Sequence, residues 1–503
     1  MLSRLLIGCV ITVVALLTQA PLPPFADDLV AAATTSSIVV NVHRFGATGD
    51  GIHDDSRAVQ RSIAAAAKVP GSTVYFPRGV YLCTSTTRLP DRVNLRGEGM
   101  GSSWLRGRLE FGSFNRISGL KIGDAGTCAV TNRPGAHGTR FSRCRLHGGG
   151  STEGAAGSVL YLGGSQGNVR NVTFARCAIE RTAYAPPAGV DAFAANVGNT
   201  ITIHEFTHLP GDGHVEGITF RDCRLGAFNG RARGALRMMM EAFCWDGRTG
   251  LVYHGWKNLT FDGCTIEASD TTGLDFADRP LTSDPTRHAS SGVLITGCTF
   301  RGARRHETYG HGGLPIVYEC PTGIVVRDNT FYASPQEAIG GSWVGTSTTA
   351  PALLIQGNTF DMTRSPVGLE HESGQPCLSL VGYGSRVLGN TFRYNTGWGV
   401  LIKSGGGSLA TVGNVVRGNT FLDSRTSDGE PTIKLADDLG RGCHDNRIVG
   451  NTIRNRGAGR RGVIYQSSGT GTNYATDNSI DCGASLPFVV VSGQIVRSGN
   501  RIF

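Results

Sequence analysis

Short apolar segments with one repeated pattern recur along most of the chain, at a spacing of about 30 residues that is typical of solenoid repeats. Each segment places an apolar residue three positions before a cysteine in the first half of the chain. In the second half an asparagine takes the place of the cysteine without a change of frame. The repeated positions are Cys144, Cys177, Cys223, Cys264 and Cys298, and then Asn329, Asn358, Asn390, Asn419 and Asn451.

This repeat predicts a solenoid of short β-strands. A short apolar strand cannot bury its inner face alone, so each coil must stack on the next to build a continuous core. An asparagine at the turn is expected to bond backbone groups of its own coil and the amide of its neighbour, whereas a cysteine there packs as a small apolar residue. One cysteine per coil is not the paired spacing of a zinc site, and disulfides between adjacent rungs stay open. The predicted fold class is all-β, a right-handed parallel β-helix.

The N-terminal segment gives an independent signal. Residues 45–56 read FGATGDGIHDDS, a helix is predicted over Ser56–Ala67, and residues 72–81 read STVYFPRGVY. These motifs resemble the opening of the pectate lyase superfamily, which includes polygalacturonase-like hydrolases, polysaccharide lyases, uronate epimerases and phage tailspikes. The resemblance implies a right-handed parallel β-helix that acts on polysaccharide. We expect the helix to cap the solenoid, with Asp54 or Asp55 as its N-cap.

Composition narrows the setting of the protein. A single arginine precedes an apolar run in residues 1–20, which predicts a secretory signal peptide and an extracellular location. The solenoid domain is then predicted over residues 38–503. The formal charge of +9 suits an anionic partner such as an acidic polysaccharide, or a mildly basic soluble protein with no such partner. We expect no cofactor, no nucleic acid and no membrane contact after signal cleavage, and leave the oligomeric state open.

Residues 204–214 read HEFTHLPGDGH and match the zinc-ligand pattern of metzincin proteases, HExxHxxGxxH. The segment that contains His204 alternates apolar and polar residues and is β-branched, which predicts a strand, and Pro210 would interrupt the helix that a zincin needs. We therefore expect no metal site, and a zinc protease is the remote alternative. His204 and His208 share a face of a strand and stay candidates for contact with a metal or substrate, while His214 completes the pattern.

Acidic residues on successive coils provide the candidate chemistry. Polar residues that interrupt apolar strands should line the outer face of a sheet, and glycoside hydrolysis needs two carboxylates that flank the scissile bond. The predicted catalytic residues are Glu241, Asp275 and Glu319. The predicted substrate-binding residues are His204, Arg237, Asp278, Lys403, Lys434 and Trp343, and the other aromatic candidates for stacking on sugar rings are Trp245, Trp256 and Trp398.

Two alternatives to a hydrolase stay open. β-Elimination on a uronate polymer needs a base and cations that neutralise the substrate carboxylate, which Lys403 and Lys434 offer. Residues 401–404, which read LIKS, are similar to the lysine segment of chondroitinase-type lyases. The second alternative is a glycan-binding solenoid without catalytic activity.

Overall fold

The structure is a computed structural model of the chain, and residues 37–503 form the unit that carries the fold. It describes residues 37–149, 158–163, 168–181, 199–205, 215–226, 237–242, 256–267, 272–278, 291–303, 314–319, 322–343, 353–372, 374–394, 397–404, 410–423, 429–437, 439–456, 461–467 and 469–503.

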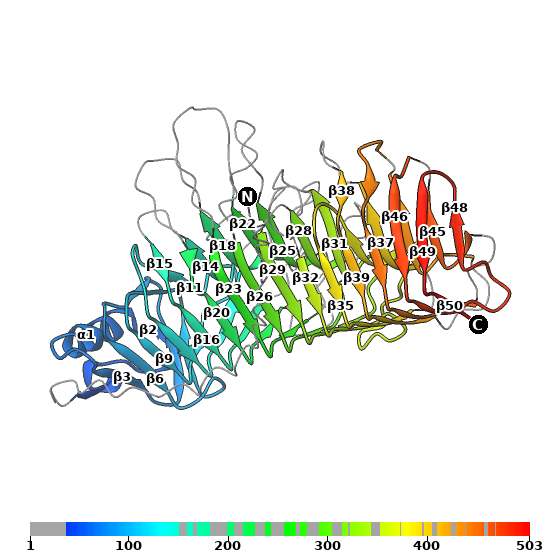
Figure 1. Cartoon of the computed structure of the whole chain (residues 1–503). Helices are drawn as coiled ribbons and strands as arrows, with labels where there is room; N and C mark the ends of the chain where they lie inside the picture. Colours follow the sequence, from blue (N-terminus) through cyan, green and yellow to red (C-terminus); the bar gives the residue numbers. More distant parts are fainter. Residues whose placement is uncertain are drawn as a thin grey trace, which may run out of the picture. The chain divides into compact units, whose positions relative to one another are not determined.

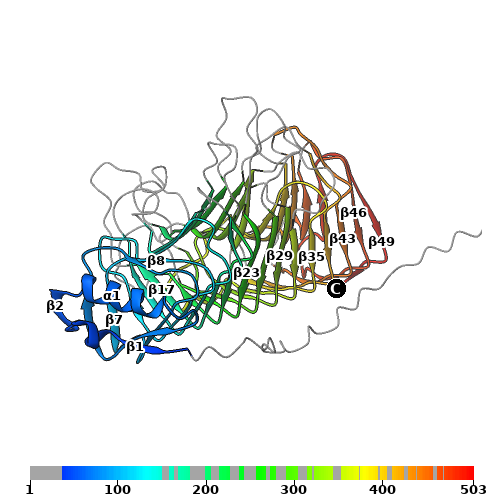
Figure 2. The same ribbon diagram turned by 90° about the vertical axis from the view of Figure 1, so that its left-hand side faces the viewer.

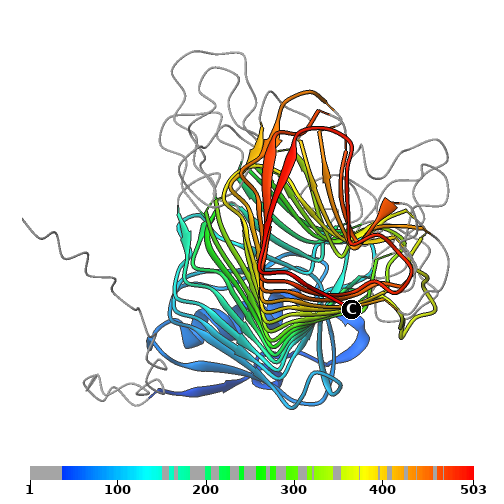
Figure 3. The same cartoon turned by 45° about the vertical axis from the view of Figure 1, so that its right-hand side comes forward.

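Three long sheets of parallel strands wind around one apolar core. Each coil contributes a strand to each sheet, and that strand pairs in parallel with the equivalent strand of the next coil (Figures 1 and 3). This confirms the predicted parallel β-helix, because sheets of this kind form only when successive turns of one chain stack. Among the described strands the sheets contain 18, 16 and 14 strands, and a further two-stranded pair joins β38 (Thr411–Val412) and β42 (Cys443–His444).

The 18-stranded sheet contains β1 (Val39–Asn41), β3 (Thr73–Phe76), β6 (Asn94–Gly97), β9 (Arg116–Ser118), β12 (Arg140–Ser142), β15 (Val169–Arg170), β16 (Thr173–Ala175), β19 (Val215–Glu216), β20 (Thr219–Arg221), β23 (Lys257–Asp262), β26 (Ser291–Thr296), β29 (Thr322–Arg327), β32 (Leu353–Gln356), β35 (Arg386–Leu388), β39 (Val415–Arg417), β43 (Arg447–Val449), β46 (Thr472–Thr476) and β49 (Gln494–Ser498).

The 16-stranded sheet contains β2 (Asp50–Asp54), β4 (Gly79–Leu82), β7 (Ser103–Arg106), β10 (Lys121–Ile122), β13 (Arg145–Gly148), β17 (Ala178–Arg181), β21 (Arg224–Leu225), β24 (Thr265–Ile266), β27 (Thr299–Phe300), β30 (Thr330–Tyr332), β33 (Thr359–Asp361), β36 (Thr391–Tyr394), β40 (Thr420–Asp423), β44 (Thr452–Arg454), β47 (Ser479–Asp481) and β50 (Arg501–Ile502).

The 14-stranded sheet contains β5 (Thr87–Arg88), β8 (Leu109–Phe111), β11 (Val130–Asn132), β14 (Leu160–Gly163), β18 (Asn199–Glu205), β22 (Arg237–Ala242), β25 (Thr272–Asp278), β28 (Leu314–Glu319), β31 (Ile339–Trp343), β34 (Pro376–Leu380), β37 (Trp398–Lys403), β41 (Ile433–Ala436), β45 (Ile464–Gln466) and β48 (Phe488–Val490).

A helix covers the N-terminal end of the core. Helix α1 (Ser56–Ala66) follows the short 3₁₀ helix η1 (Val42–Phe45) and buries Val59 and Ile63 (Figure 2). This confirms the predicted capping helix. Asp55 occupies the N-cap position, but its carboxylate accepts from the backbone N–H groups of Thr48 and Gly49, at 2.7 and 3.0 Å, rather than from the helix. Asp54 instead accepts from the N–H of Ser56 at 3.0 Å.

No helix in the described part of the chain is long and apolar enough to cross a lipid bilayer.

The repeated turn residues form buried rungs between the 18-stranded and 16-stranded sheets. We call the coils with Cys144 to Cys298 at this turn the cysteine coils, and those with Asn329 to Asn500 the asparagine coils. From Asn358 onward each side-chain oxygen accepts from both the backbone N–H and the side-chain amide of the preceding rung, as Asn390 does from Asn358 at 2.8 and 2.9 Å. The Asn390 amide also donates to the carbonyl oxygen of Ile355 at 2.9 Å. The predicted asparagine ladder is confirmed.

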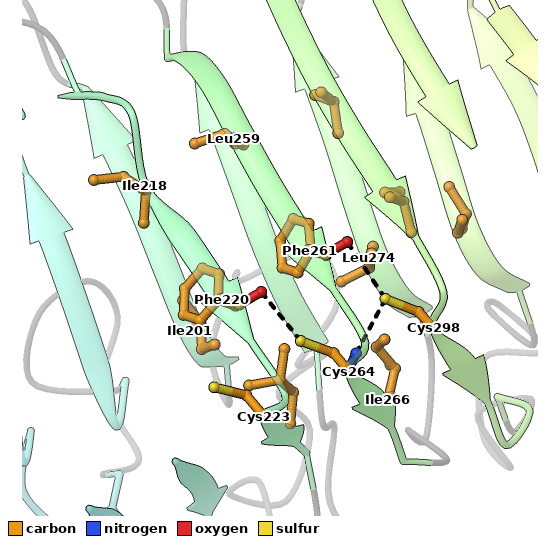
Figure 4. Close-up of a cluster of buried hydrophobic side chains, with 14 of the residues drawn as sticks. Ile201, Ile218, Phe220, Cys223, Leu259, Phe261, Cys264, Ile266, Leu274 and Cys298 are labelled. Atoms are coloured by element: carbon orange, nitrogen blue, oxygen red, sulfur yellow. Dashed lines mark hydrogen bonds between the residues drawn. The ribbon is translucent and has the colours of Figure 1, made fainter. Parts of the chain in front are cut away.

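The cysteine coils use the same bonding positions with sulfur. The Cys264 thiol donates to the Phe220 carbonyl oxygen at 3.4 Å, and the N–H of Cys264 donates to the sulfur of Cys298 at 3.3 Å (Figure 4). Ten cysteines in the described part of the chain are buried as thiols, so the disulfides left open by the sequence are not formed among them. The hydrogen bond with the Cys177 thiol, together with burial, raises the pKa of Cys223 to about 12, as expected for structural rather than reactive thiols.

The aromatic stack in the core changes sheets between the two sets of coils. In the cysteine coils Phe141, Phe174, Phe220 and Phe261 stack along the 18-stranded sheet, with ring centroids 4.8 to 5.2 Å apart. From Phe300, in the coil of Cys298, the stack runs along the 16-stranded sheet at 4.5 to 4.8 Å and continues in the asparagine coils through Phe331, Phe360, Phe392 and Phe421.

Candidate functional site

Every predicted catalytic and substrate-binding residue lies on a strand of the 14-stranded sheet. Figure 1 shows strands β18, β22, β25, β28, β31 and β37 following one another along the stack. The carboxylate residues come from β22, β25 and β28, which are consecutive, and the predicted lysines come from β37 and β41. Strand pairing therefore places on one sheet residues that are up to 230 positions apart in the chain, from His204 to Lys434.

The register of the backbone divides the predicted residues into rows. Across successive strands, position 204 pairs with 241, 241 with 277, 277 with 319, and 319 with 343. His204, Glu241, Glu319 and Trp343 therefore share one row. Asp275 lies in a second row, two residues nearer the start of its strand, where it pairs with Met239 and Val317. Asp278 pairs with Ala242, and Arg237 with Asn199.

Both rows alternate with the core positions of the same strands. Leu274 and Phe276 are fully buried and flank Asp275, and Ile316 is 1% exposed and Tyr318 2% exposed on the strand that ends at Glu319. Burial raises the pKa of the Tyr318 phenol, whose O–H donates to the backbone oxygen of Ser379 at 3.2 Å. The alternation is that of a sheet with one face packed on the core, and the backbone positions of the two rows fall between the buried positions.

Glu337 adds a carboxylate to this face that the sequence did not indicate. It precedes β31, and its carboxylate accepts a hydrogen bond of 3.0 Å from the hydroxyl of the buried Ser379. A Cβ atom on Gly340 would lie 2.2 Å from a methyl carbon of Leu314 and 3.6 Å from the other Glu337 oxygen, so the carboxylate lies beside this glycine. Gly340 pairs with Val317, in the row that contains Asp275. Glu337 was missed because it comes from a turn and not from a strand with alternating residues.

The C-terminal part of the same sheet carries cations beside aromatic rings. Lys434 pairs with Leu401 and Tyr465, and its ammonium lies 4.3 Å from the centre of the Trp398 ring. Lys403, at the end of β37, is partly exposed. The lysines are thus separated from the carboxylate rows by strands β31 and β34.

Two residues that the sequence did not single out complete this C-terminal cluster. Glu430 lies just before β41 and accepts from the indole N–H of Trp398. Its other oxygen forms an ion pair with Arg461, which precedes β45. The Glu430 side chain is 13% exposed, and that of Arg461 is 58% exposed. No strand pattern marks either residue, because both lie in the segments that lead into strands.

Trp256 lies in the core, and the first histidine of the metzincin-like pattern lies on a strand. Trp256 is 1% exposed and its ring lies 5.8 Å from that of Phe276, so the prediction that it is available to sugar rings is wrong. It was misplaced because a tryptophan at the start of a coil can equally fill the core. His204 lies on β18, as the strand prediction for the histidine motif required, whereas His208, His214 and Trp245 lie outside the described residues. A zincin would hold its first two histidines on one helix, which β18 is not.

The comparisons with known proteins agree with this architecture. Residues 39–275 match the model of a family described as rhamnogalacturonase A/epimerase, pectate lyase-like. Together with the stacked parallel sheets, this match confirms the resemblance of the N-terminal segment to pectate lyase-like proteins, and the strand pairings define the fold as a parallel β-helix.

Individual relatives match shorter parts of the chain. A mannuronan C5-epimerase, AlgE1, from Azotobacter vinelandii is 33% identical over 153 residues, which is 28% of this chain and 10% of the relative. Among solved structures, the A-module of the A. vinelandii epimerase AlgE6 has a TM-score of 0.45 at 18% identity over 92% of this chain and 99% of the module. The catalytic unit of an α-1,3-glucanase from Streptomyces thermodiastaticus has a TM-score of 0.43 at 12% identity over 94% of this chain and 70% of that unit. These scores add no argument beyond the strand pairings.

Proposed function

We propose that the protein is a secreted polysaccharide-degrading enzyme, and that a sugar polymer lies along the outer face of the 14-stranded sheet. The observation that carries this proposal is the register that sets Glu241 and Glu319 in one row, two strands apart. Two strand spacings amount to about 10 Å. Carboxyl groups about 6.5–9.5 Å apart flank the scissile bond and a water molecule in inverting glycoside hydrolases.

In this proposal one carboxylic acid protonates the leaving glycosidic oxygen and the other carboxylate takes a proton from the attacking water. Asp275, one strand from each glutamate but in the neighbouring row, and Glu337 are the further carboxylates within reach of the same polymer. Trp343 shares the row of the glutamates and would contact a sugar ring beside them. The apolar run in residues 1–20 supports the secreted location in this proposal.

A second candidate is chemistry on a uronic acid, by elimination or epimerisation. It is favoured by the match to mannuronan C5-epimerases and by two lysines on the same sheet, Lys403 and Lys434. Both reactions remove a proton next to a carboxylate, and a cation stabilises the charge that develops there.

The test is incubation of the purified protein with a panel of acidic and neutral polysaccharides. New reducing ends without ultraviolet absorbance indicate hydrolysis, and absorbance near about 235 nm indicates the unsaturated product of elimination. Glu241→Gln or Glu319→Gln should lower kcat by about 100-fold or more, and Lys403→Met should leave it nearly unchanged. Full activity in Glu241→Gln, Asp275→Asn, Glu319→Gln and Glu337→Gln alike would overturn the hydrolase assignment. Binding without any product on the whole panel would identify a glycan-binding solenoid.

A further inference from the structure

Four side chains from three successive coils form one connected cluster on the 14-stranded sheet. Glu430 is its centre, because it accepts from the Trp398 indole N–H with one oxygen and pairs with Arg461 through the other. The ammonium of Lys434 lies over the Trp398 ring, 4.3 Å from its centre. Tyr465 is the register partner of Lys434 on the next strand. We call Trp398, Glu430, Lys434 and Arg461 the tryptophan–cation cluster.

The backbone around the cluster is fixed by buried polar groups. The side-chain amide of Asn455, which is fully buried, donates to the Glu430 backbone oxygen at 3.1 Å and to the Thr432 hydroxyl at 3.1 Å. That hydroxyl also accepts from Tyr394 at 2.9 Å. The segment that presents Glu430 is thus held before any ligand arrives, which reduces the ordering cost of binding.

The cluster carries a net positive charge. It contains one carboxylate and two cations, and Glu430 is committed to Trp398 and Arg461. Within the described ranges of the chain, Lys434 has the Trp398 ring beside it and no carboxylate within ion-pair distance. The Arg461 side chain is 58% exposed and uses one nitrogen for Glu430, so part of its guanidinium faces solvent. Such an arrangement favours an anion beside an apolar ring.

A lysine–tryptophan pair on another sheet shows what is particular to this cluster. Lys121 lies 3.4 Å from the centre of the Trp104 ring on the 16-stranded sheet. There the indole N–H donates to the backbone oxygen of Gly123 at 2.8 Å, and the guanidinium of Arg106, 5.7 Å from the ring centre, pairs with Asp124 at 2.9 Å. Lys121 is also close enough to Asp124 and Glu180 for both carboxylates to act on its charge. The ring contact is of the same kind, but at Trp104 two carboxylates lie beside the lysine and oppose the binding of an anion.

We propose that the tryptophan–cation cluster is a subsite for a negatively charged sugar, a uronate or sulfated residue, of the polymer on the 14-stranded sheet. The ammonium of Lys434 and the free side of the Arg461 guanidinium bind the acidic group, and Tyr465 contacts the sugar ring. Strand β41 lies four strand spacings from β28, or about 19 Å along the sheet. The subsite therefore binds a different sugar residue from the one at the carboxylate rows. This inference rests on the proposed function and specifies it, because it makes the substrate an acidic polymer several residues long.

The experiment measures binding directly, so that it does not depend on turnover. Calorimetric titrations of the full chain use polygalacturonate, alginate, chondroitin sulfate and a neutral dextran, with the double substitution Lys434→Met and Arg461→Met. For the acidic polymer that the unsubstituted protein binds, Kd should rise at least about 10-fold, as expected for the loss of two charge contacts. Its dependence on salt should become weaker.

Lys121→Met is the matched control, since it removes a lysine from the same kind of ring contact elsewhere, and it should leave Kd unchanged. Equal thermal stability of the variants excludes unfolding as the cause. An unchanged Kd in the double variant, or an equal loss of affinity for dextran, would overturn the subsite while the proposed function stands. Failure of the unsubstituted protein to bind any of the polymers would remove both the subsite and the proposed function.

Discussion

The cysteine coils and the asparagine coils stack in the same way but are held at the turn by different chemistry. In both sets the rung side chain donates to the carbonyl oxygen three residues before the preceding rung, as Cys264 does to Phe220 and Asn390 to Ile355. The asparagine oxygen also accepts two bonds from the rung before it, whereas a thiol accepts one weak bond. The backbone position is thus the same, and the asparagine coils gain extra bonds at it.

A second ladder strengthens the contrast. Asn414, Asn446 and Asn473 form another row of side-chain bonds five residues before the first ladder, so that the strands of the 18-stranded sheet between them are flanked on both sides. The N–H of Ser385 donates to Asn414 at 2.8 Å and begins this row. Among the described residues of the cysteine coils, Thr139 alone makes the equivalent bonds, accepting from the N–H of Asn115 at 3.2 Å. The next coils depend more on apolar packing, and the position is occupied there by Val172, Ile218 and Leu259.

The aromatic stack and the rung residue do not change at the same coil. The coil that ends the cysteine series has Ile295 before Cys298 and Phe300 after it, and Phe300 stacks on Phe331 at 4.5 Å. Phe300 therefore already belongs to the stack of the asparagine coils. In this coil the side on which phenylalanine lies therefore matches that of the neighbouring ring and not the rung residue of its own coil.

The largest effect is expected in the middle of the asparagine ladder. Asn390→Ala leaves the two donors of Asn358 and the carbonyl oxygen of Ile355 buried without these partners. Unfolding free energy should fall by about 3 kcal/mol or more, measured by urea denaturation. Asn500→Ala is the control, because that rung is partly exposed and water can replace the amide, so its cost should stay below about 1 kcal/mol. Equal losses would contradict the role assigned to the buried bonds.

Exchange of the rung residue should depend on the coil. Cys298→Asn places an amide between the Phe261 carbonyl and the Asn329 oxygen, where both its donors find acceptors, so stability should change by less than about 0.5 kcal/mol. Cys223→Asn adds the same volume beside the Phe220 stack and directs one amide hydrogen toward sulfur, which should cost about 2 kcal/mol. Denaturation midpoints of the two variants provide the measurement. A larger loss for Cys298→Asn than for Cys223→Asn would reverse the comparison.

Loss of a thiol should be mild in comparison with loss of an amide. Cys264→Ala removes one sulfur atom and its weak hydrogen bond to the Phe220 carbonyl oxygen. The expected loss of unfolding free energy is about 1 kcal/mol. Cys264→Ser retains a donor for the Phe220 carbonyl oxygen. Comparison of the serine and alanine variants therefore separates the contribution of the hydrogen bond from that of packing. A cost for Cys264→Ala that equals that of Asn390→Ala would show that the two ladders contribute equally.

The smallest expected effect is on the pH dependence of stability and concerns His371, a buried histidine of the asparagine coils. Burial lowers the pKa of His371, although its ring nitrogens lie 3.0 Å from the backbone oxygens of Ser334 and Gln375 and Glu337 is nearby. A depressed folded-state pKa means that the unfolded chain binds the proton more readily, so this contribution to stability is present above about pH 6.5 and is lost as the pH falls.

From about pH 7.5 to about pH 5.5, His371→Asn should therefore lose a few degrees less in Tm than the unsubstituted protein. His444→Asn, at an exposed position beside Asp445, is the control and should follow the unsubstituted protein. A greater loss of Tm in His371→Asn on acidification would mean that the two carbonyl oxygens hold this histidine in its charged form.

Much of the fold could be predicted because one cysteine or asparagine at the same position of each coil marks the repeat. The change from Cys298 to Asn329 keeps the frame, so one alignment of the coils gave the rungs, the strands beside them and the ladder. The second ladder was missed because Asn414 and Asn446 lie at irregular ends of strands, where no apolar alternation marks them. All nine candidate site residues lie on strands of one sheet, and their roles stay predictions, whereas Glu337, Glu430 and Arg461 come from turns.

The sequence by itself determined that coils stack, which residues form the rungs, and which strands carry polar residues among apolar neighbours, because these properties repeat locally in every coil. Only the tertiary structure decided that Glu241 and Glu319 share a row while Asp275 does not, since a shift of one or two residues in strand pairing changes every neighbour and depends on the lengths of the intervening turns. The tertiary structure also decided that Trp256 fills the core and that Trp398 meets Lys434, because an aromatic side chain takes whichever space the adjacent coils leave.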